Sequence, residues 1–191
     1  MQVTLDALAE FPRRLEAHFA AVPPELLRWA PPRWDGIPSE RLTPVEQVWH
    51  LRDIEIDGYH HRFRRTLHEV HPLLPDLDSD ALARDRHYAD RDPWRALEEF
   101  RAARKDNLVL LHSLVPADFE RTAGFEGVPV TLRTLVHQLC SHDLQHLAGL
   151  QWLLGRMRLG SPIPWAASQR APASRRARMV VRSLRPSSRR W

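Results

Sequence analysis

Two histidines four residues apart, His142 and His146, have the spacing that most directly suggests chemistry in this sequence. They lie in VHQLCSHDLQHLAGLQWLLG, a segment of helical composition. Four residues make about one helical turn, so both imidazoles leave the same side of the helix. Two neutral imidazoles on one face are half of a metal site. The pair therefore predicts metal ligation, although helices also produce such pairs by chance in a chain with eleven histidines.

A third histidine, His50, lies far upstream in TPVEQVWHLRDIE, which is also helical in composition. If the two helices pack together, three ring nitrogens can converge on one ion. Three protein ligands would leave coordination positions open, as a catalytic metal requires. On an ideal helix, however, His50 lies off the apolar stripe, on a flank with Glu46 and Asp53. The helical wheel therefore predicts a solvent-facing His50 that could reach a metal only at the rim of the bundle.

The helix that carries the histidine pair should bury one face. Leucines share an arc with His146, and His142 lies at the edge of that arc. Asp143 also points toward the apolar side. A buried carboxylate needs a partner, and the free N–H of a ligating imidazole is a candidate. The alternative is that the histidines are packing residues. Cys140 lies on another side of the helix and is expected to be a small packed residue.

Helix signals dominate the rest of the chain. Thr43-Pro44-Val45-Glu46 has the form of a capping box with proline at the first helical position. Asp92-Pro93 repeats the start signal, and Thr131 can cap a further helix. The expected long helices are 5–21, in which Pro12 marks a kink or the true start, 43–70, 93–114, and 131 to about 155 or 160. A short helix is expected at 81–88, with loops at 25–40 and 117–130. Almost no strand is predicted, so the fold class is all-α, a four-helix bundle with crossover loops.

The chain divides by composition into a bundle domain, residues 1–160, and a tail, residues 161–191. The tail is rich in Arg, Pro and Ser and is expected to be disordered. It holds eight of the 28 basic residues and no acidic one, so the rest carries 20 basic against 24 acidic residues. The domain therefore lacks the excess of positive charge typical of nucleic-acid binding. Weak, nonspecific nucleic-acid binding is expected only through the tail.

Three further features bear on compartment. No stretch of 18 apolar residues is present, so no membrane span is expected. The first residues lack the layout of a secretion signal. Cys140 is the single cysteine, so no internal disulfide can form. Together these features favour a cytoplasmic protein.

Three blocks of the sequence resemble the DinB/YfiT-like superfamily of bacterial four-helix metalloproteins. The first is TPVEQVWHLRDIEIDGYHHRFRR, with an early histidine followed by Leu and Asp. The second is DPWRALEEFRAARKDNLVLLHSL, and the third is the closing His-Asp-x-x-His helix, GVPVTLRTLVHQLCSHDLQHLAGLQWLL. Together they cover roughly residues 1–157. The resemblance implies an up-down-down-up bundle and often a homodimer. Its three metal ligands fall on His50, His142 and His146.

The resemblance also implies a divalent ion, with zinc or nickel favoured over iron or manganese. Relatives include metal-dependent S-transferases for small thiols such as bacillithiol or mycothiol, with a small electrophile as the other substrate. In that reading Asp53 and Asp143 would orient imidazoles, and Glu46 is a candidate base. Two alternatives stay open: a metal-dependent hydrolase, and a non-catalytic, stress-associated bundle that binds a metal or a small molecule.

Overall fold

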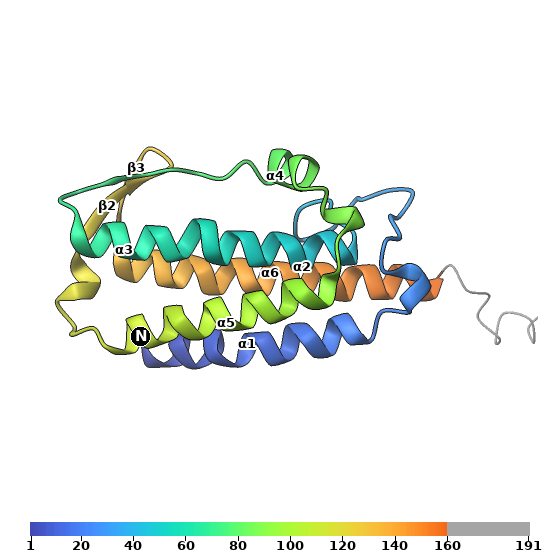
Figure 1. Cartoon of the computed structure of the whole chain (residues 1–191), viewed down its shortest axis with the longest axis horizontal. Helices are drawn as coiled ribbons and strands as arrows, with labels where there is room; N and C mark the ends of the chain where they lie inside the picture. Colours follow the sequence, from blue (N-terminus) through green and yellow to red (C-terminus); the bar gives the residue numbers. More distant parts are fainter. Residues whose placement is uncertain (160–191) are drawn as a thin grey trace, which may run out of the picture. The chain divides into compact units, whose positions relative to one another are not determined.

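Four long helices form an up-down-down-up bundle (Figure 1). The computed structural model describes residues 1–159, of which Met1–Arg158 form one compact unit. The helices are α1 (Gln2–Ala20), α2 (Pro44–Asp53) continued by η2 (Ile54–His60) and α3 (His61–His68), α5 (Pro93–His112), and α6 (Leu132–Leu159). The predicted four-helix bundle is confirmed. The predicted tail lies outside the described residues.

The predicted helix starts are capped by the predicted residues. Glu46 N donates to Thr43 Oγ1 at 3.5 Å, and Thr43 N donates to Glu46 Oε2 at 2.8 Å, which completes the capping box. Asp92 accepts from Trp94 N at 3.0 Å. Thr131 accepts from Thr134 N at 3.1 Å. These bonds satisfy backbone N–H groups that a helix N-terminus leaves free, so the helix starts could be read from local sequence.

The first helix runs without interruption through Pro12. Proline has no backbone N–H, so the carbonyl of Leu8, four residues earlier, loses its helical partner. Arg104 of α5 supplies the missing donor, because its Nη1 lies 3.1 Å from Leu8 O. A side chain from another helix thus makes a proline inside α1 tolerable.

The second long helix contains a π-helical turn, η2, between α2 and α3. The wider turn shifts the phase of the helix, so the apolar stripe that follows α2 is displaced. Ile56, placed on the buried stripe by the regular helical period, is only partly buried, and Glu55 is buried in its place. Inserted π turns are frequent near functional sites.

The connection between α5 and α6 is a β-hairpin, which corrects the prediction of a loop over 117–130. After η4 (Asp118–Glu120), strand β2 (Thr122–Phe125) pairs antiparallel with β3 (Val128–Thr131). The short strand β1 (Leu73–Leu74) adds to β2 in parallel. The turn residues Glu126 and Gly127 both have positive φ, as two-residue hairpin turns of this hand require. Each strand is too short for its alternation to stand out in the sequence.

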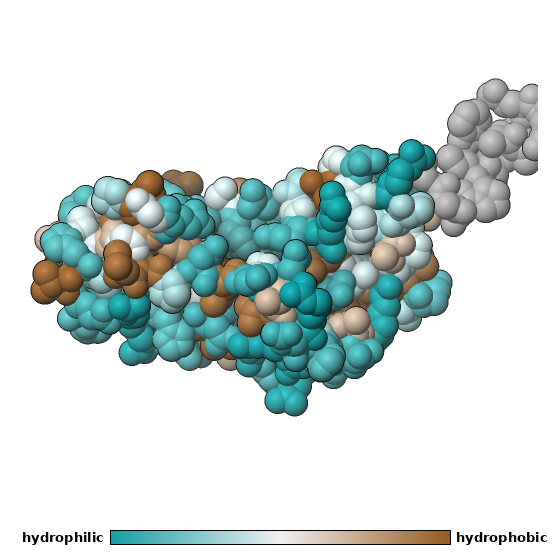
Figure 2. Space-filling model, turned by 90° about the horizontal axis from the view of Figure 1, so that it is seen from above, coloured by the Kyte–Doolittle hydropathy of each residue, from teal (hydrophilic) through white to brown (hydrophobic). Residues whose placement is uncertain are grey.

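Two other connections cover the bundle. The segment 21–43 contains only the short 3₁₀ helix η1 (Pro24–Leu26). The α3–α5 connection contains α4 (Ser79–Asp85) and the 3₁₀ helix η3 (Tyr88–Asp90), close to the predicted 81–88 helix. Figure 2 shows hydrophobic side chains gathered near the hairpin end of a largely hydrophilic face. Within residues 1–159, no helix is long and apolar enough to cross a membrane.

Candidate metal centre

Three histidines from two helices and one glutamate from a loop converge at one point. His50 comes from α2, whereas His142 and His146 come from α6. The Nε2 atoms of His50 and His142 lie 3.1 Å apart. Glu40 Oε2 lies 3.0 Å from His146 Nε2. The four residues offer ligand atoms that all lie within 4.8 Å of one another.

The ring chemistry of this cluster suits a divalent cation. His50 is 1% exposed and His146 is fully buried. Burial lowers the pKa of His50 to about 3 and places the pKa of His142 well below its usual value, so both rings are neutral, the form that binds metals. His146 Nε2 is buried, and no described residue donates a hydrogen bond to it, since Glu40 offers only a carboxylate oxygen there. A bound metal ion would satisfy such a nitrogen.

Gln47 fixes the orientation of His146. Its Oε1 lies 2.7 Å from His146 Nδ1, and an amide oxygen can only accept, so Nδ1 carries the proton. In a neutral ring the lone pair would then be on Nε2, the atom that faces Glu40. This outer contact sets the tautomer that a metal ligand needs.

Burial of His50 corrects the wheel prediction of a solvent-facing residue. The flank that carries His50 and Asp53 is covered by two connections that no helical period describes. The 21–43 segment places Glu40 beside the histidines, and η3 places Tyr88 on Asp53. His50 therefore lies inside the protein although it lies off the apolar stripe.

The segment that carries Glu40 is held against α6 by small and aromatic residues. Ser39 Oγ accepts from Gln47 Nε2 at 3.1 Å. Trp34 stacks on Trp152 of α6, with ring centroids 6.3 Å apart. Gly149 leaves the space for this approach, because a Cβ there would collide with Ser39 Oγ and lie 2.9 Å from Gln47 Nε2.

Gly149→Ala is therefore expected to destabilise the protein by about 1–3 kcal/mol, because the new methyl group forces Ser39 and Gln47 apart. We also expect weaker metal binding, since Gln47 orients His146. Gly155→Ala on the same helix is the control, because within residues 1–159 a Cβ there would meet no atom within 4 Å outside its own stretch of helix. There the better helix former should stabilise by up to about 1 kcal/mol. Urea unfolding measures the free energy of unfolding of both variants. An equal change in the two variants would contradict the packing role of Gly149.

The three predicted supporting acids have other partners. Asp143 bonds to Arg104, with Nη1 donating to Oδ2 at 2.7 Å, and makes no bond to an imidazole of the described chain. Asp53 accepts from Tyr88 Oη and from Arg86 Nη1. The carboxylate of Glu46 is used by the helix cap. None of the three has the contact with the site that was predicted for it.

Asp143 belongs to a buried ionic cluster behind the histidines. Arg104 is 1% exposed and donates to two carboxylates, Glu55 and Asp143, as well as to Leu8 O. Asn107 also donates to Glu55 at 2.8 Å. Burial raises the pKa of Asp143 to about 7, against the lowering effect of Arg104. The cluster ties α1, η2, α5 and α6 together beside His142.

Glu40 and Gln47 were missed by the sequence prediction. Glu40 lies in a proline-rich segment without periodicity, so no sequence signal marks it. Gln47 stands three residues before His50 on the same helix, and that spacing was a usable signal.

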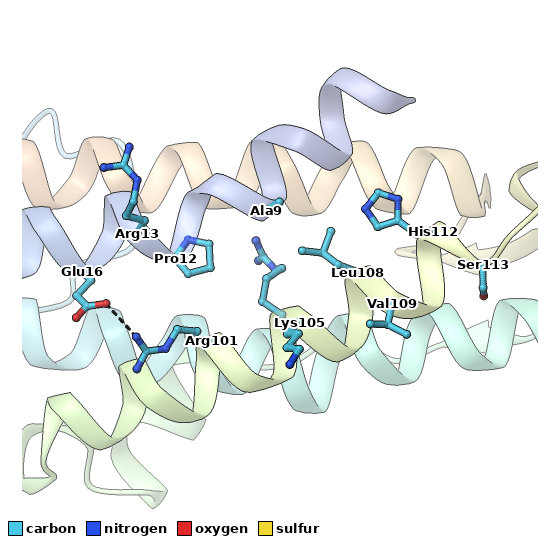
Figure 3. Close-up of a pocket in the computed structure, with 11 residues that line it drawn as sticks. Ala9, Pro12, Arg13, Glu16, Arg101, Lys105, Leu108, Val109, His112 and Ser113 are labelled. Carbon is cyan, nitrogen blue, oxygen red and sulfur yellow. Dashed lines mark hydrogen bonds and ion pairs between the residues drawn. The ribbon is translucent and has the colours of Figure 1, made fainter.

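A cavity of about 370 Å³ adjoins the histidine cluster, with Glu40 and His142 in its wall. A larger cavity, about 780 Å³, lies between α1 and α5 around Pro12 and Leu108 (Figure 3). Residues of the metal cluster do not line that larger cavity. The smaller one is therefore the space from which a small molecule would reach the centre.

Comparison with known proteins agrees with this fold. Among solved structures, the chain is similar to YfiT from Bacillus subtilis, with a TM-score of 0.70 and 22% identity over 82% of this chain and 87% of that one. That protein is described as "a probable metal-dependent hydrolase with an unusual four-helix bundle topology". No protein with a curated description matches the chain. The profile of the DinB superfamily matches residues 7–150, and the chain therefore belongs to the DinB superfamily.

Proposed function

We propose that this protein is a divalent-metal-dependent enzyme that transfers a small-molecule thiol to a small electrophile. The observation that carries the proposal is the convergence of three histidines and Glu40 at the wall of a cavity. When bound, the metal would lower the pKa of a thiol and hold the thiolate for attack. A purely structural ion would be closed off by its ligands, whereas this cluster borders a space of about 370 Å³.

The protein's own residues supply orientation and a base. His50, His142 and His146 would hold the ion, and Gln47 keeps the lone pair of His146 on Nε2. Glu40 is 39% exposed and lies on a loop that borders the cavity. A glutamate at such a half-exposed position is a carboxylate at neutral pH. We propose that Glu40 accepts the proton of the incoming thiol, the role predicted for Glu46 from the sequence.

Glu40→Gln should retain metal and lose activity, because three imidazoles suffice to hold the ion. The expected loss in kcat/KM is about 10²–10⁴-fold, the usual contribution of a positioned base. The assay follows consumption of monochlorobimane with bacillithiol, mycothiol or another small thiol, beside elemental analysis of the same samples. Glu25→Gln, in the same segment but outside the cluster, is the control.

Two outcomes would contradict these roles. If the metal content of Glu40→Gln falls together with its activity, Glu40 is a ligand and not a base. If the metal-loaded wild-type protein consumes no thiol with any electrophile, the transferase proposal fails.

Metal-dependent hydrolysis is the second candidate. It is favoured by the similarity to YfiT, which is described as a probable metal-dependent hydrolase. The same residues would serve, with Glu40 accepting a proton from water in place of a thiol. Turnover of an ester or amide substrate by metal-loaded protein without any thiol would favour hydrolysis.

A further inference from the structure

The cavity beside the metal centre extends well beyond the histidines. Along one side it is lined by Ile54 and Tyr59 of η2 and by Arg62 of α3. Gln138 and Gln145 of α6 also line it. The wall is therefore polar over much of its length. Its charged members are the cation Arg62 and the acids Glu40, Asp76 and Glu126.

Arg62 is buried but poorly paired. It is 4% exposed, and its guanidinium carbon lies 4.2 Å from the ring centroid of Phe125 and 5.0 Å from that of Tyr59. Nη2 donates to Pro75 O at 3.3 Å and lies 3.5 Å from a carboxylate oxygen of Asp76, whose side chain is 68% exposed. Nε makes no hydrogen bond with a described residue, and the guanidinium also has a polar contact with the side chain of Tyr59.

Arg104, also a buried arginine, shows which contacts offset the cost of burying a guanidinium. Arg104 directs its nitrogens at two buried carboxylates and one carbonyl. Those carboxylates raise the pKa of Arg104, whereas burial lowers the pKa of Arg62. A buried cation with so little compensation is costly unless an anion joins it. Glu126 also lines the cavity, but it forms no hydrogen bond with Arg62 among the described contacts.

The distance between the Arg62 guanidinium and the histidine cluster sets the length of a ligand that contacts both. A Cβ at Gly58 would lie 3.6 Å from Arg62 Nη1. The guanidinium of Arg62 therefore lies beside Gly58, which precedes Arg62 by about one helical turn. Gly58 follows His50 by eight residues, which corresponds to at most about 12 Å along the helix axis, because the π-helical turn η2 lies within this stretch. Gln138 stands one turn before His142, and its buried Oε1 has no partner in the described chain.

We propose that Arg62 binds an anionic group, a carboxylate or a phosphate, at the far end of the molecule whose reacting end meets the metal centre. Gln138 Oε1 accepts a hydrogen bond from a hydroxyl or N–H group in the middle of that molecule. The substrate class is thus an elongated, anionic small molecule with a polar middle. This inference rests on the proposed function, because it takes the metal centre as the reacting end.

The test uses cobalt(II)-loaded full-length protein and straight-chain thiols of increasing length. Mercaptopropanoate, mercaptohexanoate and mercaptooctanoate, each with a terminal thiol, are compared with mercaptoalkanols of the same length. The readout is the thiolate-to-cobalt absorption band, titrated to give a Kd. In the wild type we expect at least one longer acid to bind about tenfold or more tightly than its alcohol, as a charge-assisted hydrogen bond provides. Mercaptopropanoate is too short to reach Arg62 from the metal, so it should bind no more tightly than its alcohol.

Arg62→Gln should remove the preference for the acid and leave the alcohols unchanged. Arg62→Lys, which keeps the cation, should retain part of the preference and guards against misfolding of the glutamine variant. Arg65→Gln is the matched control, because Arg65 stands on the same helix and pairs with Glu69 outside the cavity. Mercaptohexyl phosphate distinguishes a phosphate site from a carboxylate site. If it binds more tightly than mercaptohexanoate, the group that Arg62 binds is a phosphate.

Equal binding of acids and alcohols by the wild type, or an acid preference that survives in Arg62→Gln, overturns the inference alone. A missing band with every alcohol, despite stoichiometric cobalt, refutes the proposed function and the inference with it. The two failures are therefore distinguishable.

Discussion

His146→Ala is expected to abolish stoichiometric binding of a divalent metal, and His142→Ala and His50→Ala should do the same. Each removes one of three nitrogens that face a common point. Loss of an outer contact alone usually costs about 10–100-fold in metal affinity, so loss of a ligand should exceed about 100-fold. The measurement is elemental analysis after reconstitution with zinc, nickel, manganese and iron.

His137→Ala is the control for this series, because His137 lies on the same helix but is exposed and contacts Thr4. It should bind as much metal as the wild type. Circular dichroism should show the helical content of all four variants unchanged, since the bundle core is formed by other residues. Full metal content in any of the three ligand variants would exclude that residue from the centre. A wild type that takes up none of the four metals would make the histidines packing residues.

Arg104→Met is expected to lower the free energy of unfolding by about 3–5 kcal/mol, the largest stability effect of any single change considered. The substitution leaves Glu55 and Asp143 buried without their cation and Leu8 O without a donor. Methionine keeps most of the volume, so the loss reports charge and hydrogen bonding and not a cavity. Urea unfolding of metal-free protein measures the effect without a contribution from metal binding.

Arg101→Met, three residues earlier on α5, provides the comparison. Its side chain is 61% exposed and lies 3.5 Å from Glu16, so the change should stay within about 0.5 kcal/mol. Replacing Arg104, Glu55 and Asp143 together by Met, Gln and Asn should recover part of the lost stability, because no unpaired charge then remains. A loss below about 1 kcal/mol in Arg104→Met would show that water already reaches the cluster.

Local sequence determined the long helices and two of the three proposed histidine ligands. A cap residue followed by proline marks a helix start within one turn, so Thr43 and Asp92 could be assigned directly, and Thr131 could be assigned as a cap residue without a proline. His142 and His146 share one helix face, and their convergence follows from helical geometry alone. His50 as the third ligand came from resemblance, because its own helix places it off the apolar stripe.

Tertiary structure decided everything that depends on segments distant in sequence. His50 is buried because the 21–43 segment lies over its flank, and Glu40 joins the site through the same segment. Arg104 pairs with Asp143 across 39 residues, which no periodicity encodes. The sheet is completed by β1, whose Leu73 pairs with Gly124 of the hairpin between α5 and α6, far along the chain. Helical geometry repeats within a few residues and can be read locally, whereas contacts between loops and helices exist only after the chain has packed.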